Sequence, residues 1–218
     1  MSSENQPPEL QWRDGGVPVS TRFDDPYFSL AGGLEETRHV FLAGNDLPAR
    51  LRPGFHVAEL GFGTGLNLLA LAEIAPIPIR FTSFEAYPFD ISQLQRAHAA
   101  FPALAELSAE LRAGYGPQPF RVGRVEVTLI FGDARDQLPK WPDAADAWFL
   151  DGFSPARNPE LWGPALMGEV AAHTRKSGSF ATYSAAGHVR RALEAAGFAV
   201  SRAPGYAGKR HMSRGHLL

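Results

Sequence analysis

The 218-residue chain contains no cysteine. This absence excludes disulfide bonds, metal sites built on thiolates and catalysis by a cysteine nucleophile. The seven histidines are scattered along the chain and form no pair at the spacing that a zinc site uses. The sequence therefore predicts a protein that holds no metal ion.

Long apolar runs are also missing, since no window approaches the ~18 consecutive apolar residues that a membrane-spanning helix requires. The first residues, MSSENQPPELQWRDGG, are polar and do not follow the basic-then-apolar order of a signal peptide. Hydrophobic residues make up 44% of the chain and charged residues 20%, which is an ordinary globular composition. We therefore expect a cytoplasmic enzyme that makes no contact with a membrane.

The charge of the chain is small overall but unevenly distributed. The net charge of −2 argues against a generally basic nucleic-acid-binding protein. From residue 175 onward, however, eight basic residues face one acidic residue, so this segment has a charge of +7 and the preceding chain −9. Such asymmetry indicates either an anionic partner or a solvated basic face balanced by acidic neighbours. Charge alone favours the solvated face.

Short apolar segments alternate with helical patterns along most of the chain. This alternation predicts an α/β fold with a doubly wound, mostly parallel, seven-stranded sheet of the Rossmann-like type. We expect residues 1–32 to form an N-terminal arm or hairpin and residues 33–218 to form one domain. The expected strands are residues 55–60, 79–85, 125–131, 147–150, 179–183, 198–202 and 209–212. The expected helices are residues 33–42, 64–74, 90–100, 103–113, 164–173 and 188–196.

The stretch ELGFGTGLN ends the first of these strands and opens the helix that follows it. Gly61, Gly63 and Gly65 alternate at this turn, where glycine lets the backbone approach a nucleotide-like ligand closely. The dinucleotide fingerprint G-x-G-x-x-G requires a glycine at the position of Leu66. The tighter G-x-G-x-G spacing is common in methyltransferases that use S-adenosylmethionine. The sequence therefore favours that ligand over NAD or FAD.

Carboxylates stand at or near the ends of four predicted strands, at Glu59, Glu85, Asp133 and Asp151. The carboxyl ends of parallel strands share one edge of the sheet, where ligands of this fold bind. Glu85 lies 20 residues after Gly65, at the distance where an acidic side chain accepts both ribose hydroxyls. Asp133 is placed to contact an adenine amino group, although a cap on a helix starting at the next residue would also explain it.

The segment LDGFSPARNPELW begins at the last residue of the fourth predicted strand and contains residues suited to methyl transfer to an amine. Asp151 would accept an N–H bond of the amine and direct its lone pair, while the ring of Phe153 would hold a planar base. Pro155 belongs to the pattern of proline and aromatic residues that amino-group methyltransferases often have here. A simple Asp-Gly turn is the alternative explanation.

Several segments together resemble one enzyme family: PYFS with GLEETRHVFL, ELGFGTGLN, DAWFLDGFSPARNPELW, ATYSAAGHVRRAL and GYAGKRHMSRG. They span residues 26–215 and are similar to the MnmC/MnmD family of tRNA 5-methylaminomethyl-2-thiouridine methyltransferases. The resemblance implies an S-adenosylmethionine-dependent enzyme that methylates the aminomethyl group on the wobble uridine of tRNA. Many members add an FAD-dependent oxidase domain, whose glycine-rich loop has no counterpart here. We therefore expect a methyltransferase that stands alone or belongs to a longer protein, with a separate oxidase as a partner.

The same resemblance implies roles for individual residues. Asp151 and Phe153 would face the amine and the base as catalytic residues, and Pro155 would complete the substrate pocket. The basic C-terminal segment gains an expected polyanionic partner, with Lys209 and Arg210 contacting tRNA phosphates. The residues expected to bind the cofactor are Glu59, Gly61, Phe62, Gly63, Thr64, Gly65, Asn67, Glu85, Asp133, Ala134 and Asp151.

Two other kinds of function fit parts of the pattern. A methyltransferase or aminopropyl transferase for a small amine would use the same acidic residue, and turnover of free amines without tRNA binding would favour it. A nicotinamide-dependent oxidoreductase or a nucleotide-binding module would use the same glycine loop. Leu66 and the lack of an obvious hydride-handling residue argue against the oxidoreductase.

Overall fold

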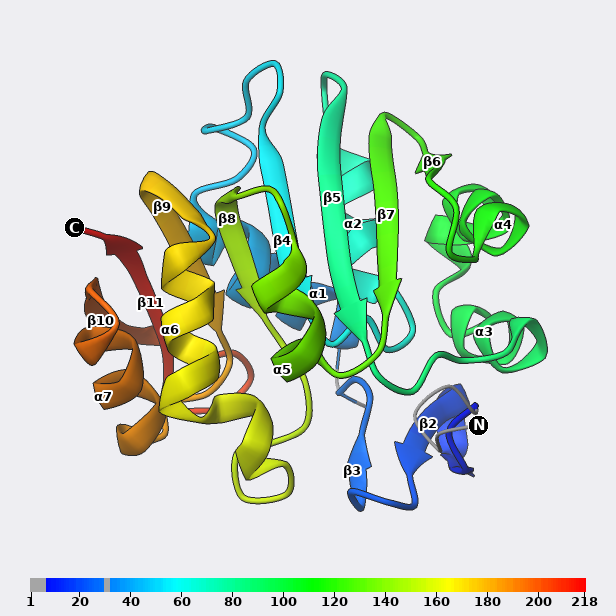
Figure 1. The fold of residues 1–218 in the computed structure, drawn as a ribbon. Coiled ribbons are helices and arrows are strands. Elements are labelled where there is room, and N and C mark those ends of the chain that lie inside the picture. The colour runs from blue at the N-terminus through cyan, green and yellow to red at the C-terminus, as the bar shows by residue number, and fades with distance from the viewer. Residues whose placement is uncertain (1–6, 30–31) are drawn as a thin grey trace.

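The computed structural model describes residues 7–29 and 32–218, so residues 1–6 and 30–31 of the predicted N-terminal arm lie outside the described part. A large twisted sheet forms the centre of the molecule, with helices on both of its faces (Figure 1). A small N-terminal sheet lies at one end of the large one (Figure 1). Within the described ranges, no helix combines the length and apolarity needed to cross a membrane.

The described part of the large sheet has eight strands in the order β10-β11-β9-β8-β4-β5-β7-β6. The neighbours β9, β8, β4, β5 and β7 run parallel, as predicted for a doubly wound sheet. By contrast, β11 and β6 run antiparallel to their neighbours. The strands are β4 (His56–Leu60), β5 (Ile79–Glu85), β6 (Phe120–Val122), β7 (Val125–Phe131), β8 (Ala145–Leu150), β9 (Thr174–Thr182), β10 (Phe198–Pro204) and β11 (His211–Leu217).

Helices cover both faces of the sheet because its central strands are apolar on both sides. In β4, Val57 belongs to the core on one face and Ala58 to the core on the other, and both residues are fully buried. Burial on both faces is typical of a central parallel strand. In Figure 1, α5, α6 and α7 lie in front of the sheet and α2 lies behind it. The helices are α1 (Gly33–Thr37), α2 (Leu66–Ile74), α3 (Ile91–His98), α4 (Ala105–Gly114), α5 (Ala134–Gln137), α6 (Pro164–Ala172) and α7 (Gly187–Ala195).

The predicted sheet was one strand short. Strand β6 forms an antiparallel hairpin with β7 through Gly123, whose φ of +54° suits the tight turn. A three-residue edge strand is too short to show the apolar alternation that reveals longer strands. The predicted last strand at residues 209–212 was also misplaced, because β11 begins at His211 and pairs with both β9 and β10.

The N-terminal residues form a three-stranded antiparallel sheet of β1 (Leu10–Arg13), β2 (Val17–Ser20) and β3 (Asp25–Pro26). Helix α1 follows, and the chain continues as a π-helical turn at Arg38–Leu42, where one helix over residues 33–42 was predicted. The small sheet lies below the carboxyl ends of β5 and β7 (Figure 1). It therefore stands at the edge of the large sheet where the sequence predicts a ligand site.

Candidate functional site

A cavity of about 870 Å³ opens at the carboxyl ends of the parallel strands. This volume falls in the usual range for small-molecule sites, roughly 300–1,000 Å³. The predicted site residues that line the cavity are Gly61, Phe62, Gly63, Thr64, Asn67, Glu85, Asp133, Ala134, Asp151, Phe153 and Lys209. The predicted site residues outside its lining are Glu59, Gly65, Pro155 and Arg210.

The small N-terminal sheet and its turns supply a wall of this cavity that the sequence analysis missed. Arg22, Phe23, Asp25 and Tyr27 all line it. The ring of Tyr27 meets that of Phe89 nearly at a right angle, with 4.7 Å between the centroids. No spacing rule marks these residues, and the PYFS segment, which contains Tyr27, was the one signal available.

Two glycines of the loop after β4 allow neighbouring segments to approach closely. Gly61 has a φ of +81°, and a Cβ atom there would lie 3.1 Å from the Cα of Gly152. Gly63 has a φ of +52°, and a Cβ atom there would lie 3.0 Å from Cδ1 of Tyr27. Both the backbone conformation and the available space therefore require glycine at these positions. The loop fits between the segment that follows β8 and the N-terminal sheet.

The third glycine of the loop has a packing role. A Cβ atom at Gly65 would lie 2.7 Å from Cζ of Phe62 and 2.8 Å from Cδ1 of Leu111. Both neighbours belong to the hydrophobic core on the α2 face of the sheet. With a φ of +74°, Gly65 turns the chain into α2. Its missing side chain makes room for the core, which explains why it does not line the cavity.

Glu85 ends β5 with a buried carboxylate that holds the glycine loop in place. Its Oε2 accepts a hydrogen bond from the N–H of Gly63 at 2.8 Å, and its Oε1 accepts one from the N–H of Tyr87 at 2.7 Å. Burial raises the pKa of Glu85, although these backbone hydrogen bonds oppose the shift. Each carboxylate oxygen retains further acceptor capacity. The side chain can therefore also accept the two hydroxyl groups of a ribose.

Asp133 caps a helix, which was the alternative to an adenine contact in the sequence analysis. Its Oδ1 accepts from the backbone N–H of Arg135 at 2.8 Å, and its Oδ2 lies 2.6 Å from Nη2 of the same residue. These hydrogen bonds lower the pKa of Asp133. The carboxylate therefore caps α5 and also lines the cavity. Its contact with an adenine amino group stays a prediction.

Asn67 links a carboxyl group at the cavity, that of Asp151, to one behind the cavity, that of Glu59. Its Nδ2 donates to Oε1 of Glu59 and to Oδ2 of Asp151, each at 2.8 Å. The hydroxyl of Thr37 donates to Oδ1 of Asn67 at 3.0 Å, so the amide has a defined orientation. Glu59 is fully buried, accepts from the hydroxyl of Ser83 at 2.6 Å, and has a pKa that burial raises well above its usual value. It supports the cavity from behind, through Asn67.

Asp151 follows β8 and places its carboxyl group at the cavity. Its Oδ1 accepts from the N–H of Gly152 at 2.8 Å, and its Oδ2 accepts from Asn67. Removal of the carboxyl from water raises the pKa of Asp151 to about 7, despite both hydrogen bonds. Within residues 7–29 and 32–218, no lysine or arginine forms an ion pair with Asp151 or Glu85. Because neither carboxyl group is in an ion pair with a lysine or arginine of the described chain, both can attract a cationic ligand.

We expect the stability of the protein to fall, relative to the Asp151→Asn variant, as the pH rises from about 4 to about 7. The pKa of an aspartate in an unfolded chain is about 3.9, whereas that of Asp151 in the folded protein is about 7. Between these values the folded protein binds the additional proton. Its free energy of unfolding should therefore decrease by up to about 1.4 kcal/mol per pH unit across this window.

Urea unfolding of the wild type and Asp151→Asn at several pH values measures this effect. The amide of the variant does not titrate, so any cost of the substitution itself is a constant offset. A stability difference that stays the same from pH 4 to pH 7 would contradict the raised pKa.

The ring of Phe153 is in contact with two aromatic residues of the N-terminal segment. Phe23 stacks on it with centroids 4.5 Å apart and ring planes at 22°. Tyr27 meets it nearly edge-on, with 4.9 Å between the centroids. The face of Phe153 that Phe23 covers is not available to a planar base in this arrangement. The N-terminal segment and the loop after β8 thus form one aromatic wall of the cavity.

Lys209 lines the cavity, but its charge is paired within the protein. Its Nζ lies 2.6 Å from Oε1 of Glu36 and 5.3 Å from the ring centroid of Tyr183. The hydroxyl of Tyr183 donates to the carbonyl of Gly152 at 2.7 Å. Lys209 therefore connects the turn before β11 to α1 and, through Tyr183, to the segment after β8. Arg210, the next residue, is exposed and lies outside the cavity lining.

Residues 99–217, more than half of the chain, match a family model described as S-adenosyl-L-methionine-dependent methyltransferase. The chain belongs to this family. The methyltransferase is 46% identical over 224 residues to the tRNA 5-methylaminomethyl-2-thiouridine biosynthesis bifunctional protein MnmC of Aromatoleum aromaticum. It is 43% identical over 227 residues to the protein of the same name in Stutzerimonas stutzeri.

These alignments include 96% of the methyltransferase chain but 35% and 34% of the two relatives. The chain therefore spans about a third of the length of the MnmC proteins that it matches. The resemblance to MnmC predicted from the sequence motifs is confirmed.

Solved structures confirm the predicted Rossmann-like methyltransferase fold. The crystal structure of MnmC2 from Aquifex aeolicus aligns with a TM-score of 0.73 and 24% identity, over 99% of this chain and 72% of that one. The precorrin-6y C5,15-methyltransferase of Geobacter metallireducens aligns with a TM-score of 0.55 and 14% identity, over 95% of this chain and 98% of that one. Both likenesses concern the fold.

The residues of the cavity fit the S-adenosylmethionine of this methyltransferase family. Gly61 and Gly63 place no side chain at two positions of the loop, and Glu85 has acceptor capacity for the ribose hydroxyls. The carboxyl groups of Glu85 and Asp151 complement the positive charge of a sulfonium group. Within the described ranges, no three or more His, Cys, Asp or Glu side chains are grouped so that they could hold a metal ion.

Proposed function

We propose that this methyltransferase methylates the aminomethyl nitrogen of 5-aminomethyl-2-thiouridine at the wobble position of tRNA, giving 5-methylaminomethyl-2-thiouridine. The main support is the carboxyl group of Asp151, which stands at the cavity two residues before Phe153 and, among the described residues, forms no ion pair. The MnmC relatives, which are named for biosynthesis of this nucleoside, align with nearly the whole chain.

Methyl transfer to an amine requires that the nitrogen lone pair point at the methyl carbon. The sulfonium cofactor supplies that methyl group when bound. Asp151 is held by hydrogen bonds from Gly152 and Asn67, so its carboxylate has a defined direction and can accept an N–H bond of the incoming amine. With a pKa of about 7, it can also receive a proton from the ammonium form of the substrate. Orientation of the amine is the role that we assign to it first.

Labelled S-adenosylmethionine and unfractionated tRNA test this proposal. With tRNA from cells that lack the modification, we expect label in the tRNA and, after digestion to nucleosides, in 5-methylaminomethyl-2-thiouridine. Fully modified tRNA is the control and should accept no label. Labelling of small amines without labelling of tRNA would instead support the small-amine transferase. No label transfer to tRNA with the hypomodified preparation would refute the proposal.

The proposed reaction requires an enzyme that supplies the aminomethyl group. The MnmC relatives are named bifunctional, and the chain aligns with about a third of each of them. We assign the preceding step, removal of a carboxymethyl group from the aminomethyl nitrogen of the uridine, to an FAD-dependent oxidase. Both reactions are placed in the cytoplasm, where their tRNA substrate is present.

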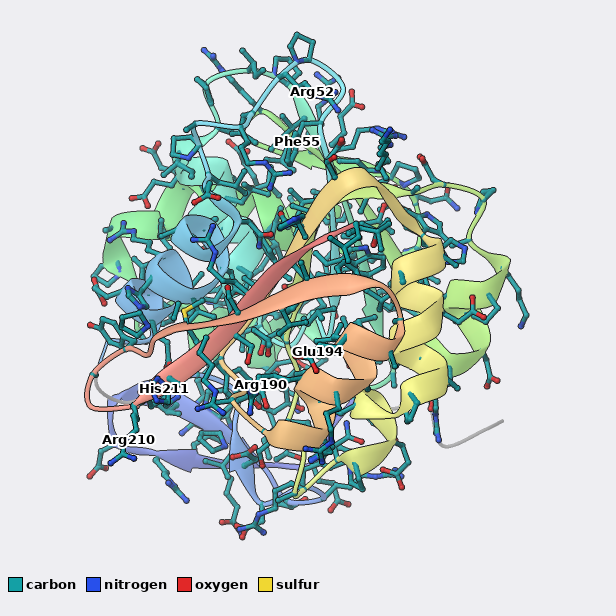
Figure 2. All side chains as sticks on the ribbon, turned by 90° about the vertical axis from the view of Figure 1, so that its left-hand side faces the viewer. Arg52, Phe55, Arg190, Glu194, Arg210 and His211 are labelled. Atoms are coloured by element: carbon teal, nitrogen blue, oxygen red, sulfur yellow. The ribbon has the colours of Figure 1, made fainter. Side chains whose placement is uncertain are left out.

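The basic C-terminal segment offers positive charge beside the cavity. Figure 2 shows Arg190, Arg210 and His211 towards one end of the molecule and Arg52 at the opposite end. Arg210 is exposed and directly follows Lys209, which lines the cavity. Within the described ranges, neither Arg190 nor Arg210 forms an ion pair. Charge that is not neutralised inside the protein is available to RNA phosphates.

Arg210→Glu is expected to weaken tRNA binding about 10-fold or more at low salt and to leave the affinity for S-adenosylmethionine unchanged. Loss of one phosphate contact should also reduce the dependence of log Kd on log salt concentration by about 0.7–0.9. Fluorescence anisotropy titrations with labelled tRNA at several salt concentrations measure both effects.

Lys176→Glu is the matched control for this prediction. It makes the same change of charge in the same basic segment, but Lys176 is exposed near the start of β9, at the opposite edge of the sheet from the cavity. We expect this variant to bind tRNA nearly as the wild type does. If both variants weakened tRNA binding equally, the effect would be one of overall charge. That result would contradict a phosphate contact at Arg210.

A further inference from the structure

A cation and three aromatic rings from three chain segments meet at the cavity, beside the loop after β8. Phe23 stacks on Phe153 at 4.5 Å, and its centroid lies 5.8 Å from that of Tyr87. The guanidinium carbon of Arg22 lies 4.8 Å from the centroid of Tyr87 and 5.5 Å from that of Phe23. All four residues line the cavity. A planar cation therefore lies over two aromatic rings of the cavity that Asp151 also lines.

The turn between β2 and β3 is tied to the loop after β8. Oδ2 of Asp25 accepts from the N–H of Ser154 at 2.8 Å, and Asp24 forms an ion pair with Arg157 at 2.8 Å. Arg22, in the same turn, is exposed and forms no ion pair within the described ranges. The turn is thus held against the loop after β8, whereas no ion pair among the described residues holds the side chain of Arg22 over the rings.

We infer that Arg22, Phe23 and Tyr87 form a stacking platform for the base next to the methyl-accepting nucleotide of an RNA substrate. Proteins stack unpaired RNA bases on aromatic rings and on guanidinium planes, and both kinds of surface are present here. An acceptor nucleotide at Asp151 and Phe153 brings its neighbour in a single-stranded loop to the adjoining rings. This inference rests on the proposed tRNA substrate, and it assigns to the N-terminal sheet the discrimination between RNA and a free amine.

Three anticodon stem-loop RNAs with 5-aminomethyl-2-thiouridine at the acceptor position test the platform. One is intact, and the other two have an abasic nucleotide on the 5′ or the 3′ side of the acceptor. Methyl transfer at saturating cofactor gives kcat/KM for the wild type, Phe23→Leu and Phe23→Trp. Leucine keeps an apolar contact with Phe153 but has no flat face, whereas tryptophan keeps the flat face.

Asp24→Asn is the control for loosening of the turn. It removes the ion pair with Arg157, and asparagine tolerates the φ of +48° at this position. We expect this variant to have nearly the kcat/KM of the wild type on the intact RNA. Calorimetry should give the same affinity for S-adenosylmethionine in all of these variants.

We expect Phe23→Leu to lower kcat/KM on the intact RNA roughly 5- to 100-fold, the range for loss of one base stack, and Phe23→Trp to retain it. With one of the two abasic RNAs, the kcat/KM of the wild type should fall by a similar factor. The kcat/KM of Phe23→Leu should be the same on this RNA as on the intact RNA, because both changes remove the same contact. Independent losses with both abasic RNAs, or full activity of Phe23→Leu on the intact RNA, would overturn the inference. Inactivity of the wild type on the intact RNA would instead refute the proposed function.

Discussion

Replacement of Gly61 by valine should weaken S-adenosylmethionine binding by at least about 100-fold while the protein still unfolds cooperatively. A Cβ atom at this position would lie 3.1 Å from the Cα and 3.3 Å from the backbone nitrogen of Gly152. Backbone atoms cannot rotate away as the end of a side chain can, so the loops after β4 and β8 must separate. Both loops line the cavity in which we expect the cofactor to bind, and their separation changes the shape of this cavity directly.

Gly54→Val separates this effect from backbone strain. Gly54 has a φ of +74°, close to the +81° of Gly61, but among the described residues no atom beyond its chain neighbours lies within 4 Å of its Cβ position. A non-glycine residue in this conformation costs about 1–3 kcal/mol of stability. Urea unfolding should therefore show destabilisation in both variants, whereas calorimetry should show loss of cofactor affinity in Gly61→Val alone. Wild-type affinity in Gly61→Val would mean that the approach of the two loops does not shape the site.

The sequence pattern predicted the long central strands well and the short or polar ones poorly. Both β5 and β7 have the predicted bounds, because each is an apolar segment that ends at a glycine or a charged residue. By contrast, β11 contains the polar residues Ser213 and Arg214, and also Gly215, a residue type that is depleted in strands. Its place between β9 and β10 depends on contacts between segments, such as the close approach of the backbone oxygen of Ala199 to the Cβ position of Gly215.

Those residues of the candidate site that stand at the ends of strands could be predicted from the sequence. Glu85 and Asp151 line the cavity because the carboxyl ends of parallel strands meet at one edge. Spacing does not tell which way a side chain points, so the buried position of Glu59 and the packing role of Gly65 were not foreseen. The contribution of Phe23 depends on a contact with Phe153, far along the chain, and no local pattern reports such a contact.

Asp151→Ala should lower turnover by about 100-fold or more, the scale expected for one positioned catalytic group. Its carboxyl oxygens accept from Gly152 and Asn67, and alanine removes the acceptor that, in the proposed reaction, directs the amine lone pair. Most of the cavity contacts remain, so binding of S-adenosylmethionine and of tRNA should persist. Single-turnover methyl transfer at saturating cofactor, with tRNA lacking the modification, measures the loss. Near wild-type turnover in this variant would remove Asp151 from the mechanism.

Asp151→Asn distinguishes orientation from proton acceptance. The amide oxygen of asparagine still accepts an N–H bond, but the amide is a far weaker base than a carboxylate. If Asp151 mainly orients the amine, the variant should keep at least about ten times the turnover of Asp151→Ala, and we expect this result. If it mainly accepts a proton, the two variants should lose equally, and the wild-type rate should rise with pH through about 7, where Asp151 ionises. The carboxylate also attracts the ammonium form of the substrate and so opposes its deprotonation, which is why a purely basic role is the weaker explanation.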